Sequence, residues 1–349
     1  MEKMDVSKKD KDLSSIMGFT RKDISKWVDK VGTVGGLIIL LIIFSFTADY
    51  FFTVRNWFNI SNQTAIYGLM AIAMTFPLIS GGIDLSAGST LGLSGVICVV
   101  VIEITHNIYI AIIAALLVGL TCGIINGLLV TRLKLNFVIA TLGTMFIYRG
   151  FSYMLTDGMP QSIRRIGEFT GDEFFKALGN DRFLGLIPYP AIVLIITALI
   201  LSFFLNTTVF ARHMYATGSD TLASSLSGIN TNQKKLAAYV FCSLIASLAG
   251  IVYTARMSSA TSSAGYGYEL EGVAAAFIGG ASIFGGTGSM SGALIGAFII
   301  GVIRNGLNLL GVDSFQQQVV IGVVIILAVY YDRIRSENQL STKYIEETK

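Results

Sequence analysis

Residues 279–311 read GGASIFGGTGSMSGALIGAFIIGVIRNGLNLLG, and this stretch decides the class of fold. Ten glycines and a few small polar residues lie within a run that is otherwise apolar enough for the interior of a membrane. Glycine and serine let helix backbones approach one another closely inside a bilayer. The stretch is therefore typical of a polytopic membrane protein with tightly packed helices, rather than of single spans surrounded by lipid.

The composition of the whole chain agrees with a membrane location. Of its 349 residues 53% are hydrophobic and 13% are charged, whereas an average soluble protein has about 25% charged residues. The three cysteines, Cys98, Cys122 and Cys242, all lie in apolar segments, where thiols pack as small apolar side chains. We therefore expect no disulfide and no metal site. The net charge of +3 is too small to indicate nucleic-acid binding.

Apolar stretches of the length that a spanning helix needs, roughly 17–25 residues, predict about ten spans, one of them short and rich in glycine and alanine. The expected spans are 32–48, 62–80, 86–104, 108–131, 137–156, 189–206, 236–256, 270–284, 290–309 and 315–331. The predicted fold is thus an all-α polytopic membrane protein. Its expected parts are a cytoplasmic N-terminal segment (1–31), a transmembrane domain (32–334) with a long inner loop (207–235), and a cytoplasmic C-terminal tail (335–349).

The distribution of basic residues orients these spans. Seventeen of the 25 lysines and arginines fall on segments that the ten-span topology places on the side of the N-terminus. Loops on the cytoplasmic side of a membrane carry an excess of basic residues, so both termini are expected in the cytoplasm. The first apolar run follows thirty polar residues, unlike the early apolar core of a signal peptide, and we expect it to be a retained span.

A faint internal repeat relates two parts of the chain. Ile125-Asn126-Gly127-Leu128 matches Arg304-Asn305-Gly306-Leu307 at an offset of 179 residues, and Ile83-Asp84-Leu85 resembles Tyr268-Glu269-Leu270 at an offset of 185. Five spans separate each member from its mate, so the copies have opposite orientations. Inverted repeats are common in transporters that alternate access between the two sides. A chance match among glycine-rich helices is the alternative.

Several side chains within the spans are candidates for packing or for a path. Glycines four residues apart offer a groove to a neighbouring helix, namely Gly119, Gly123 and Gly127 in the fourth span and Gly292 and Gly296 in the ninth. Charged and amide groups inside a membrane are costly and invite a functional interpretation, although helix capping and structural pairing are the simpler ones. The candidate path or gate residues are Asp84, Ser86, Ser89, Asn126, Tyr268, Glu269 and Asn305.

The inner loop contains the signals of a short helix. Ser219 is the expected N-cap, Asp220 favours the first turn, and Gly228 can close a helix of about two turns. Such a helix is either a docking element for a partner or a plain connector, and the residues alone leave the two nearly even.

Motifs for catalysis or nucleotide binding do not occur in the sequence. It contains no G-x-x-x-x-G-K-[ST] loop for ATP phosphates, no HExxH and no GxSxG. Its two histidines, His106 and His213, are expected on opposite sides of the membrane. We therefore expect a transport subunit rather than an enzyme, with no cofactor.

The chain resembles the membrane permeases of bacterial ABC importers for monosaccharides, of the ribose, galactose and xylose type. The resemblance covers about residues 35–335. It is carried by GGIDLSAGSTLGLSG (81–95), INGLLVTRLKLNFVIATLGTMFIYRG (125–150), ATGSDTLASSLSGI (216–229), SSATSSAGYGYELEGVAAAFIGGASIFGGTGSMSGALIGA (258–297) and NGLNLLGV (305–312).

This resemblance implies an architecture similar to the cobalamin-type importers, with ten spans and inverted four-helix repeats. It also implies three partners in the membrane system: a cytoplasmic ABC ATPase, an external sugar-binding protein, and a second permease subunit, as a homodimer or with a paralogue. The inner loop would supply the ATPase-coupling helix, through Ser219, Asp220, Ala223, Ser224, Ser227, Gly228 and Ile229. The family usually has Asn or Glu followed by Ala-Ala-Arg in this helix, and this chain departs from that pattern while it retains Ser227-Gly228-Ile229.

The expected function is the translocation of a monosaccharide, ribose being favoured, in the bacterial plasma membrane. A related permease for autoinducer-2, inositol or a nucleoside is one alternative. A secondary transporter driven by an ion gradient is another, although such proteins place ionisable residues deep in several spans and the span centres here are nearly free of charge.

Overall fold

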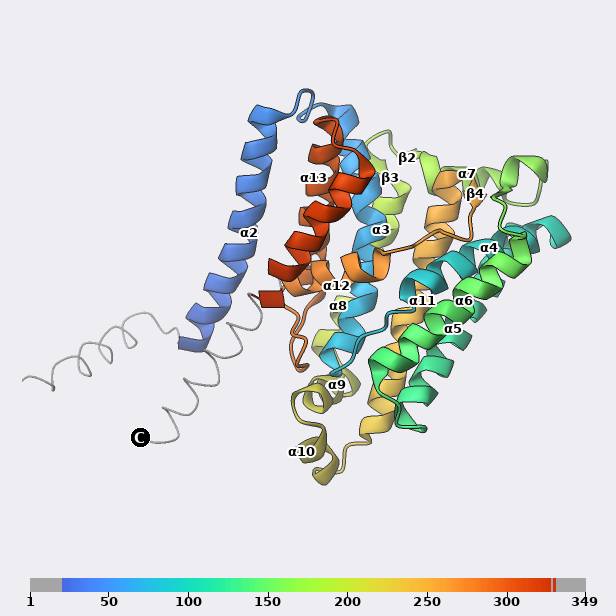
Figure 1. The fold of residues 1–349 in the computed structure, drawn as a ribbon. Coiled ribbons are helices and arrows are strands. Elements are labelled where there is room, and N and C mark those ends of the chain that lie inside the picture. Colours follow the sequence, from blue (N-terminus) through green and yellow to red (C-terminus); the bar gives the residue numbers. More distant parts are fainter. Residues whose placement is uncertain (1–20, 328, 331–349) are drawn as a thin grey trace, which may run out of the picture.

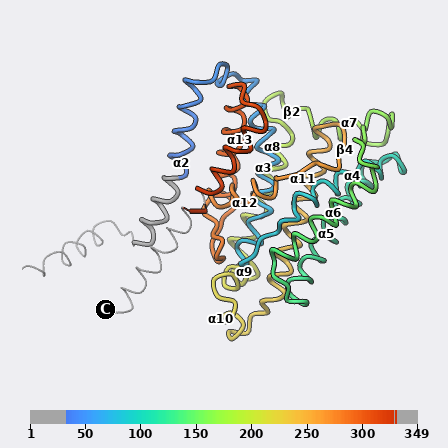
Figure 2. The backbone as a smooth tube through the Cα atoms, in the orientation of Figure 1, coloured from blue at the N-terminus to red at the C-terminus, as the bar shows by residue number. Residues whose placement is uncertain are grey.

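The computed structural model describes residues 21–327, 329 and 330 as a bundle of helices (Figures 1 and 2). Within this part of the chain, six helices are long and apolar enough to cross a membrane. They are α4 (Ala87–Thr105), α5 (Ile108–Thr131), α6 (Phe137–Thr156), α8 (Tyr189–Thr207), α11 (Thr231–Met257) and α13 (Met290–Leu309). The protein is therefore an all-α polytopic membrane protein, and the predicted fold class is confirmed.

Four further helices complete the bundle, and they bear on the predicted boundaries. They are α2 (Arg21–Thr47), α3 (Val54–Ile79), α12 (Tyr268–Ile278) and an apolar helix at Ser314–Leu327. Helix α2 begins eleven residues before the predicted span, inside the segment expected to precede the membrane domain. Residues 1–20 and the predicted tail 335–349 lie outside the described part of the chain, and the count of ten spans stays a prediction.

Helix α3 lies at the centre of the bundle because it is apolar on every face over most of its length. Every residue from Thr64 to Ile79 is buried. The ring of Phe76 stacks on that of Phe241 in α11, with 4.8 Å between centroids. Helices α11, α12 and α13 all pack against α3. A helix buried all round in this way provides the frame that the other elements surround.

The contacts between helices of one half of the bundle recur between the corresponding helices of the other half. Helices α3 and α11 run in opposite directions, α3 from the end that holds β2 and β3 toward α9, and α11 away from α10 (Figure 1). Helix α11 packs on α4 and α5, while α3 packs on α12 and α13; α4 packs on α5, and α12 on α13. Matching α3, α4 and α5 with α11, α12 and α13 converts each contact into another that is present. This arrangement is the one that an inverted repeat predicts.

Non-helical segments occur at corresponding places in the two halves of the bundle. Residues 80–86 separate α3 from α4, and residues 279–289 separate α12 from α13. The predicted span at 270–284 is therefore wrong in its second half, because the helix ends at Ile278. Gly280 and Gly285 both adopt φ of 89°, in the left-handed region that glycine occupies without strain and that cannot continue an α-helix.

Short elements cover the two ends of the bundle. One end carries α7 (Asp172–Asn180), the 3-10 turn Ile163–Arg165, β1 (Gln161–Ser162) paired antiparallel with β4 (Ser259–Ala260), and β2 (Arg182–Phe183) paired antiparallel with β3 (Ile187–Pro188). The other end carries α9 (Val209–Ser219) and α10 (Thr221–Leu226), at the lower edge of Figure 1.

Candidate functional site

The break between α3 and α4 is built around one enclosed carboxylate. Asp84 is fully buried and accepts hydrogen bonds from the Ser86 amide (3.0 Å) and the Ser86 hydroxyl (2.7 Å). The side-chain amide of Asn126 in α5 donates to both carboxylate oxygens, at 3.1 and 3.2 Å, and the Ser243 hydroxyl of α11 lies 3.4 Å away. A buried carboxylate is tolerated only with such partners. Asp84 therefore joins the start of α4 to α5 and α11.

Asn126 extends this network to a fourth helix. Its amide nitrogen also donates to the Ser86 hydroxyl at 2.7 Å, and its carbonyl oxygen accepts from the Tyr148 hydroxyl of α6 at 3.4 Å. Ser89, one turn into α4, is fully buried, and its hydroxyl makes no hydrogen bond with the described residues. Of the predicted path residues, Asp84, Ser86 and Asn126 thus lie together. Asp84, Ser86, Ser89 and Asn126 are all enclosed within this one chain.

The segment of turns before α12 is held from α6. The guanidinium of Arg149 donates to the backbone carbonyls of Ser262 and Ala264, both at 2.6 Å. Glu269, in the first turn of α12, accepts from the amide of Gly267 at 3.3 Å and is almost fully buried. The hydrogen bonds of Arg149 therefore go to main-chain oxygens and not to a carboxylate. The segment needs these donors because its carbonyls have no helical partners.

A second polar cluster joins α12 and α13 on the opposite side of α3. Arg304 forms an ion pair with Glu271, and its guanidinium lies 5.5 Å from the ring centroid of Tyr67. Tyr268 packs edge-to-face on Tyr67, with 5.2 Å between ring centroids. The sequence analysis singled out Glu269 and missed Glu271. The signal was available, since two acidic residues in one apolar helix call for two partners.

Asn305, on α13, lies apart from Tyr268 and Glu269 and contacts the start of α3. Its side-chain amide donates to the Asn56 carbonyl oxygen at 2.8 Å and accepts from the Asn56 amide at 2.9 Å. Both residues are buried. Asn126 and Asn305, which the sequence repeat pairs, therefore both hydrogen-bond across helices, and each ties the end of one helix to the beginning of another.

The glycines chosen from their spacing lie between packed helices. On α5, Gly119, Gly123 and Gly127 face α11, and a Cβ atom at Gly123 would stand 2.6 Å from the Val240 Cα. On α13, Gly292 and Gly296 face the end of α12 in the same manner. Such close backbone approach is the usual role of small residues inside a membrane.

The end of the bundle that holds α9 and α10 presents a short helix with an apolar surface. Asp220 is the N-cap of α10, and its carboxylate accepts from the Ala223 amide at 2.9 Å. The expected N-cap, Ser219, is instead the last residue of α9, because α9 continues to that point and the chain turns one residue later. Gly228 follows α10 with φ of 81°. Leu222 and Leu226 are 72% and 82% exposed on this helix.

The other residues of the inner loop are placed around α10 as follows. Ser224 is buried against the loop, Ser227 ends the helix with its hydroxyl bonded to the Ala223 carbonyl at 2.9 Å, and the amide of Ile229 donates to the Ser224 carbonyl at 3.1 Å. All the predicted coupling residues therefore belong to one compact turn at the tip of the molecule.

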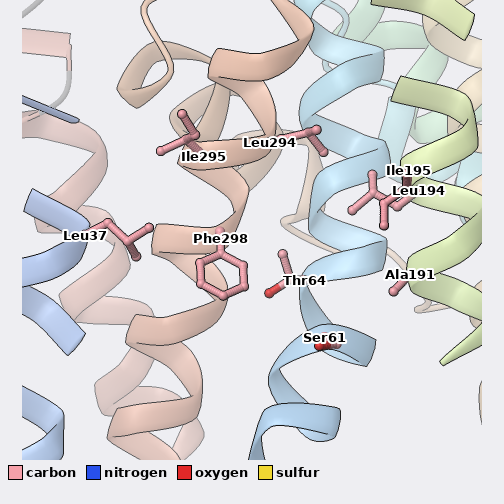
Figure 3. Close-up of a pocket in the computed structure, with 9 residues that line it drawn as sticks. All are labelled: Leu37, Ser61, Thr64, Ala191, Leu194, Ile195, Leu294, Ile295 and Phe298. Carbon is pink, nitrogen blue, oxygen red and sulfur yellow. The ribbon is translucent and has the colours of Figure 1, made fainter. Parts of the chain in front are cut away.

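An apolar cavity of about 340 Å³ lies between α2, α3, α8 and α13 (Figure 3). Its lining consists of Leu37, Ser61, Thr64, Ala191, Leu194, Ile195, Leu294, Ile295 and Phe298. The Ser61 hydroxyl is bonded to the Trp57 carbonyl of its own helix at 2.8 Å. The wall offers no charged group, so this cavity does not suit a ligand with many hydroxyl groups. Among the described residues, no group of three or more His, Cys, Asp or Glu side chains could hold a metal ion.

Comparison with known proteins places these features in a family. The profile of the family described as "Branched-chain amino acid transport system / permease component" matches residues 56–329. The ribose import permease protein RbsC of Escherichia coli (strain K12) is 41% identical over 306 residues, which cover 88% of this chain and 94% of that protein.

Two further relatives show the range of similarity. RbsC of Bacillus subtilis (strain 168) is 43% identical over 309 residues, with 88% of this chain and 94% of that protein covered. The L-arabinose transport system permease protein AraH of Escherichia coli (strain K12) is 34% identical over 309 residues, with 88% and 92% covered. No solved structure matches the chain significantly.

Proposed function

The chain belongs to this family of transport permease components, and from that premise we propose that it is the membrane subunit of an ATP-driven importer for a monosaccharide. The relatives named for ribose import share 41–43% identity with it, and the relative named for L-arabinose shares 34%. Ribose is therefore the favoured substrate. The proposed location is the bacterial plasma membrane, with both termini in the cytoplasm.

The observation that carries this proposal is the surface of α10. A six-residue helix at the tip of a membrane bundle exposes two leucines, Leu222 and Leu226, outside the apolar spans. Two apolar side chains that project together from a short helix outside the spans offer a contact for a protein partner. We propose that the partner is a separate cytoplasmic ATPase, since the chain has no phosphate-binding loop of its own. The docking segment is then Ser219–Ile229.

The proposed path lies between two copies of the chain. A sugar loses several kcal/mol of hydration if it enters hydrocarbon without partners, so the path must be polar or filled with water. Asp84, Ser86 and Asn126 are enclosed within one chain, and their proposed role is to hold the walls of the path. The region 265–279, where Tyr268 is only partly buried, supplies the proposed wall surface, and the region 84–94, which is buried except for Leu85, supports it from behind. An external sugar-binding protein supplies the affinity that such a weak path lacks.

Two alternatives remain distinguishable from this proposal. A secondary transporter needs an ionisable group that exchanges its ion, whereas Asp84 and Glu271 are each engaged with donors of the protein itself. A permease for autoinducer-2, inositol or a nucleoside would share the same ATPase and differ in the external protein. Uptake that survives collapse of the ion gradient and stops when ATP is exhausted would exclude the secondary transporter.

The deciding experiment measures ATP hydrolysis by the partner ATPase with this chain reconstituted in lipid. Leu222→Asp combined with Leu226→Asp removes the apolar surface of α10 and should abolish the control that the permease exerts on hydrolysis. Leu184→Asp is the matched control, because Leu184 is equally exposed (79%) but lies in the β2–β3 turn at the opposite end. Unchanged control in the double variant would refute the docking assignment. An unaltered chain that binds no ATPase would refute the importer itself.

A further inference from the structure

At the inner end of the bundle, three backbone segments meet with no side chain between them. Gly218, near the end of α9, lies against Ile79, the last residue of α3, and against Gly286, in the loop between α12 and α13. A Cβ atom at position 218 would overlap the Ile79 carbonyl oxygen and stand 2.7 Å from the Gly286 nitrogen. Only glycine fits here. We call this arrangement the 79–218–286 contact.

The 79–218–286 contact also joins the two halves of the bundle directly. The amide of Gly286 donates to the carbonyl of Ile79 at 3.0 Å. Ile79 leads into the break that contains Asp84, and Gly286 lies three residues before the N-cap of α13. The two irregular segments at the inner end, one from each half, are therefore tied to each other at the point where α9 touches both.

Two side-chain contacts fix α9 in this position. The Tyr215 hydroxyl donates to the carbonyl of Gly288 at 2.7 Å, in the loop between α12 and α13. At the other end of α9, the Lys234 ammonium group of α11 lies 3.6 Å from the ring centroid of Phe210. Helix α9 is thus attached both to α11 and to the loop that precedes α13.

Helix α10 is linked to this position through Asp220 and through the hydroxyl of Thr221, which donates to the Thr217 carbonyl of α9 at 2.9 Å. The amide of Asp220 donates to the Ala216 carbonyl of α9 at 3.1 Å, while the Asp220 carboxylate caps α10. Packed protein interiors have low compressibility and transmit displacement. Since backbone meets backbone at Gly218, no side-chain rotation is available there to absorb a movement of α10. A displacement at the docking surface must reach Ile79 and Gly286 together.

We propose that Gly218 is the positioning residue through which α10 sets the arrangement of both interrupted helix pairs. This inference rests on the proposed function, since it assigns the route by which a docked ATPase controls the path. Two features carry this role: residue 218 has no side chain, and the Tyr215 hydroxyl is hydrogen-bonded to the carbonyl of Gly288. It requires no new ligand.

The test uses the complete transporter in lipid vesicles, with its ATPase and its loaded binding protein, and measures sugar taken up per ATP hydrolysed. Gly218→Ala should lower this ratio about tenfold, a change within the range of coupling mutations. Tyr215→Phe keeps the ring and loses only the bond to Gly288, and should lower the ratio about fivefold. Gly150→Ala is the matched control, because a Cβ atom at this helical glycine meets nothing within 4 Å.

A merely destabilised protein would lose uptake and permease-stimulated hydrolysis in proportion, so the ratio separates coupling from folding. If Gly218→Ala fails to assemble, Tyr215→Phe alone decides. Normal ratios in the variants that assemble would overturn the inference, provided that the unaltered transporter couples hydrolysis to uptake. If the unaltered chain shows no ATP-dependent uptake, the proposed function is refuted instead.

Discussion

The replacement of Asn126 by alanine offers the sharpest test of the enclosed network. Its side-chain amide is the only group in the described structure that bonds both oxygens of Asp84 and the Ser86 hydroxyl together. The variant removes these contacts and leaves the carboxylate in a site from which solvent is excluded. The two serine side chains around Asp84 cannot replace a donor from α5.

The magnitude follows from the number and kind of bonds. A hydrogen bond to a charged group contributes about 1.5–3 kcal/mol, and interhelical bonds measured within membranes average about 0.6 kcal/mol. Because Asp84 is wholly enclosed, the upper range applies, and Asn126→Ala should cost about 2–4 kcal/mol. Asn126→Asp should cost more, since it places a second carboxylate about 3 Å from the first.

The assay is the unfolding of the purified protein in detergent. It measures the denaturant concentration at which half of the protein is unfolded and the temperature at which half of the folded protein is lost. Thr121→Ala is the matched control on the same helix, because Thr121 is exposed and its hydroxyl bonds only to the Leu117 carbonyl of α5. It should change stability by less than about 0.5 kcal/mol. If Asn126→Ala is no less stable than the control, or if Asn126→Asp is the more stable variant, the network does not hold these helices together.

Three further variants have expected outcomes, which are measured by stability, by folded yield and by proteolysis. Glu271→Gln should destabilise the protein by about 3 kcal/mol because Arg304 is left unpaired, and adding Arg304→Met should recover part of this loss; a double variant worse than the single one would contradict it. Gly123→Val should prevent α5 from packing on α11 and greatly reduce the folded yield, whereas Gly143→Val, at a glycine with open space around it, should not. Arg149→Lys should loosen the segment before α12, seen as faster proteolysis within 258–267 and not elsewhere, since one ammonium cannot reproduce the fixed fork of a guanidinium.

The boundaries of most helices could be predicted because membrane spans are recognisable by their apolar composition. The expected spans 108–131, 137–156 and 290–309 coincide with α5, α6 and α13. The prediction was wrong at 279–284, where apolar content suggested helix and glycine conformation ended it. Composition records whether a residue tolerates lipid, whereas Gly280 and Gly285 show that backbone torsion decides whether the helix continues.

The polar side chains within the spans could be picked out from the sequence, but their partners were not predictable. Asp84 and Asn126 are 42 residues apart, and Asn56 and Asn305 are 249 apart. No periodicity along the chain relates positions so distant. The repeat in the sequence indicated which residues correspond between the halves, yet it did not indicate that Arg304 would pair with Glu271 rather than with Glu269.

The sequence by itself determined that this protein is an all-α membrane protein with closely packed helices, because the hydrophobic run lengths and the small residues within them are local properties of the chain. Only the tertiary structure decided that the end of α3 at Ile79 and the irregular segment at 279–289 meet at Gly218. That meeting depends on where α9 lies relative to two helix ends more than 200 residues apart, and close contact between backbones leaves no side-chain signature except a glycine.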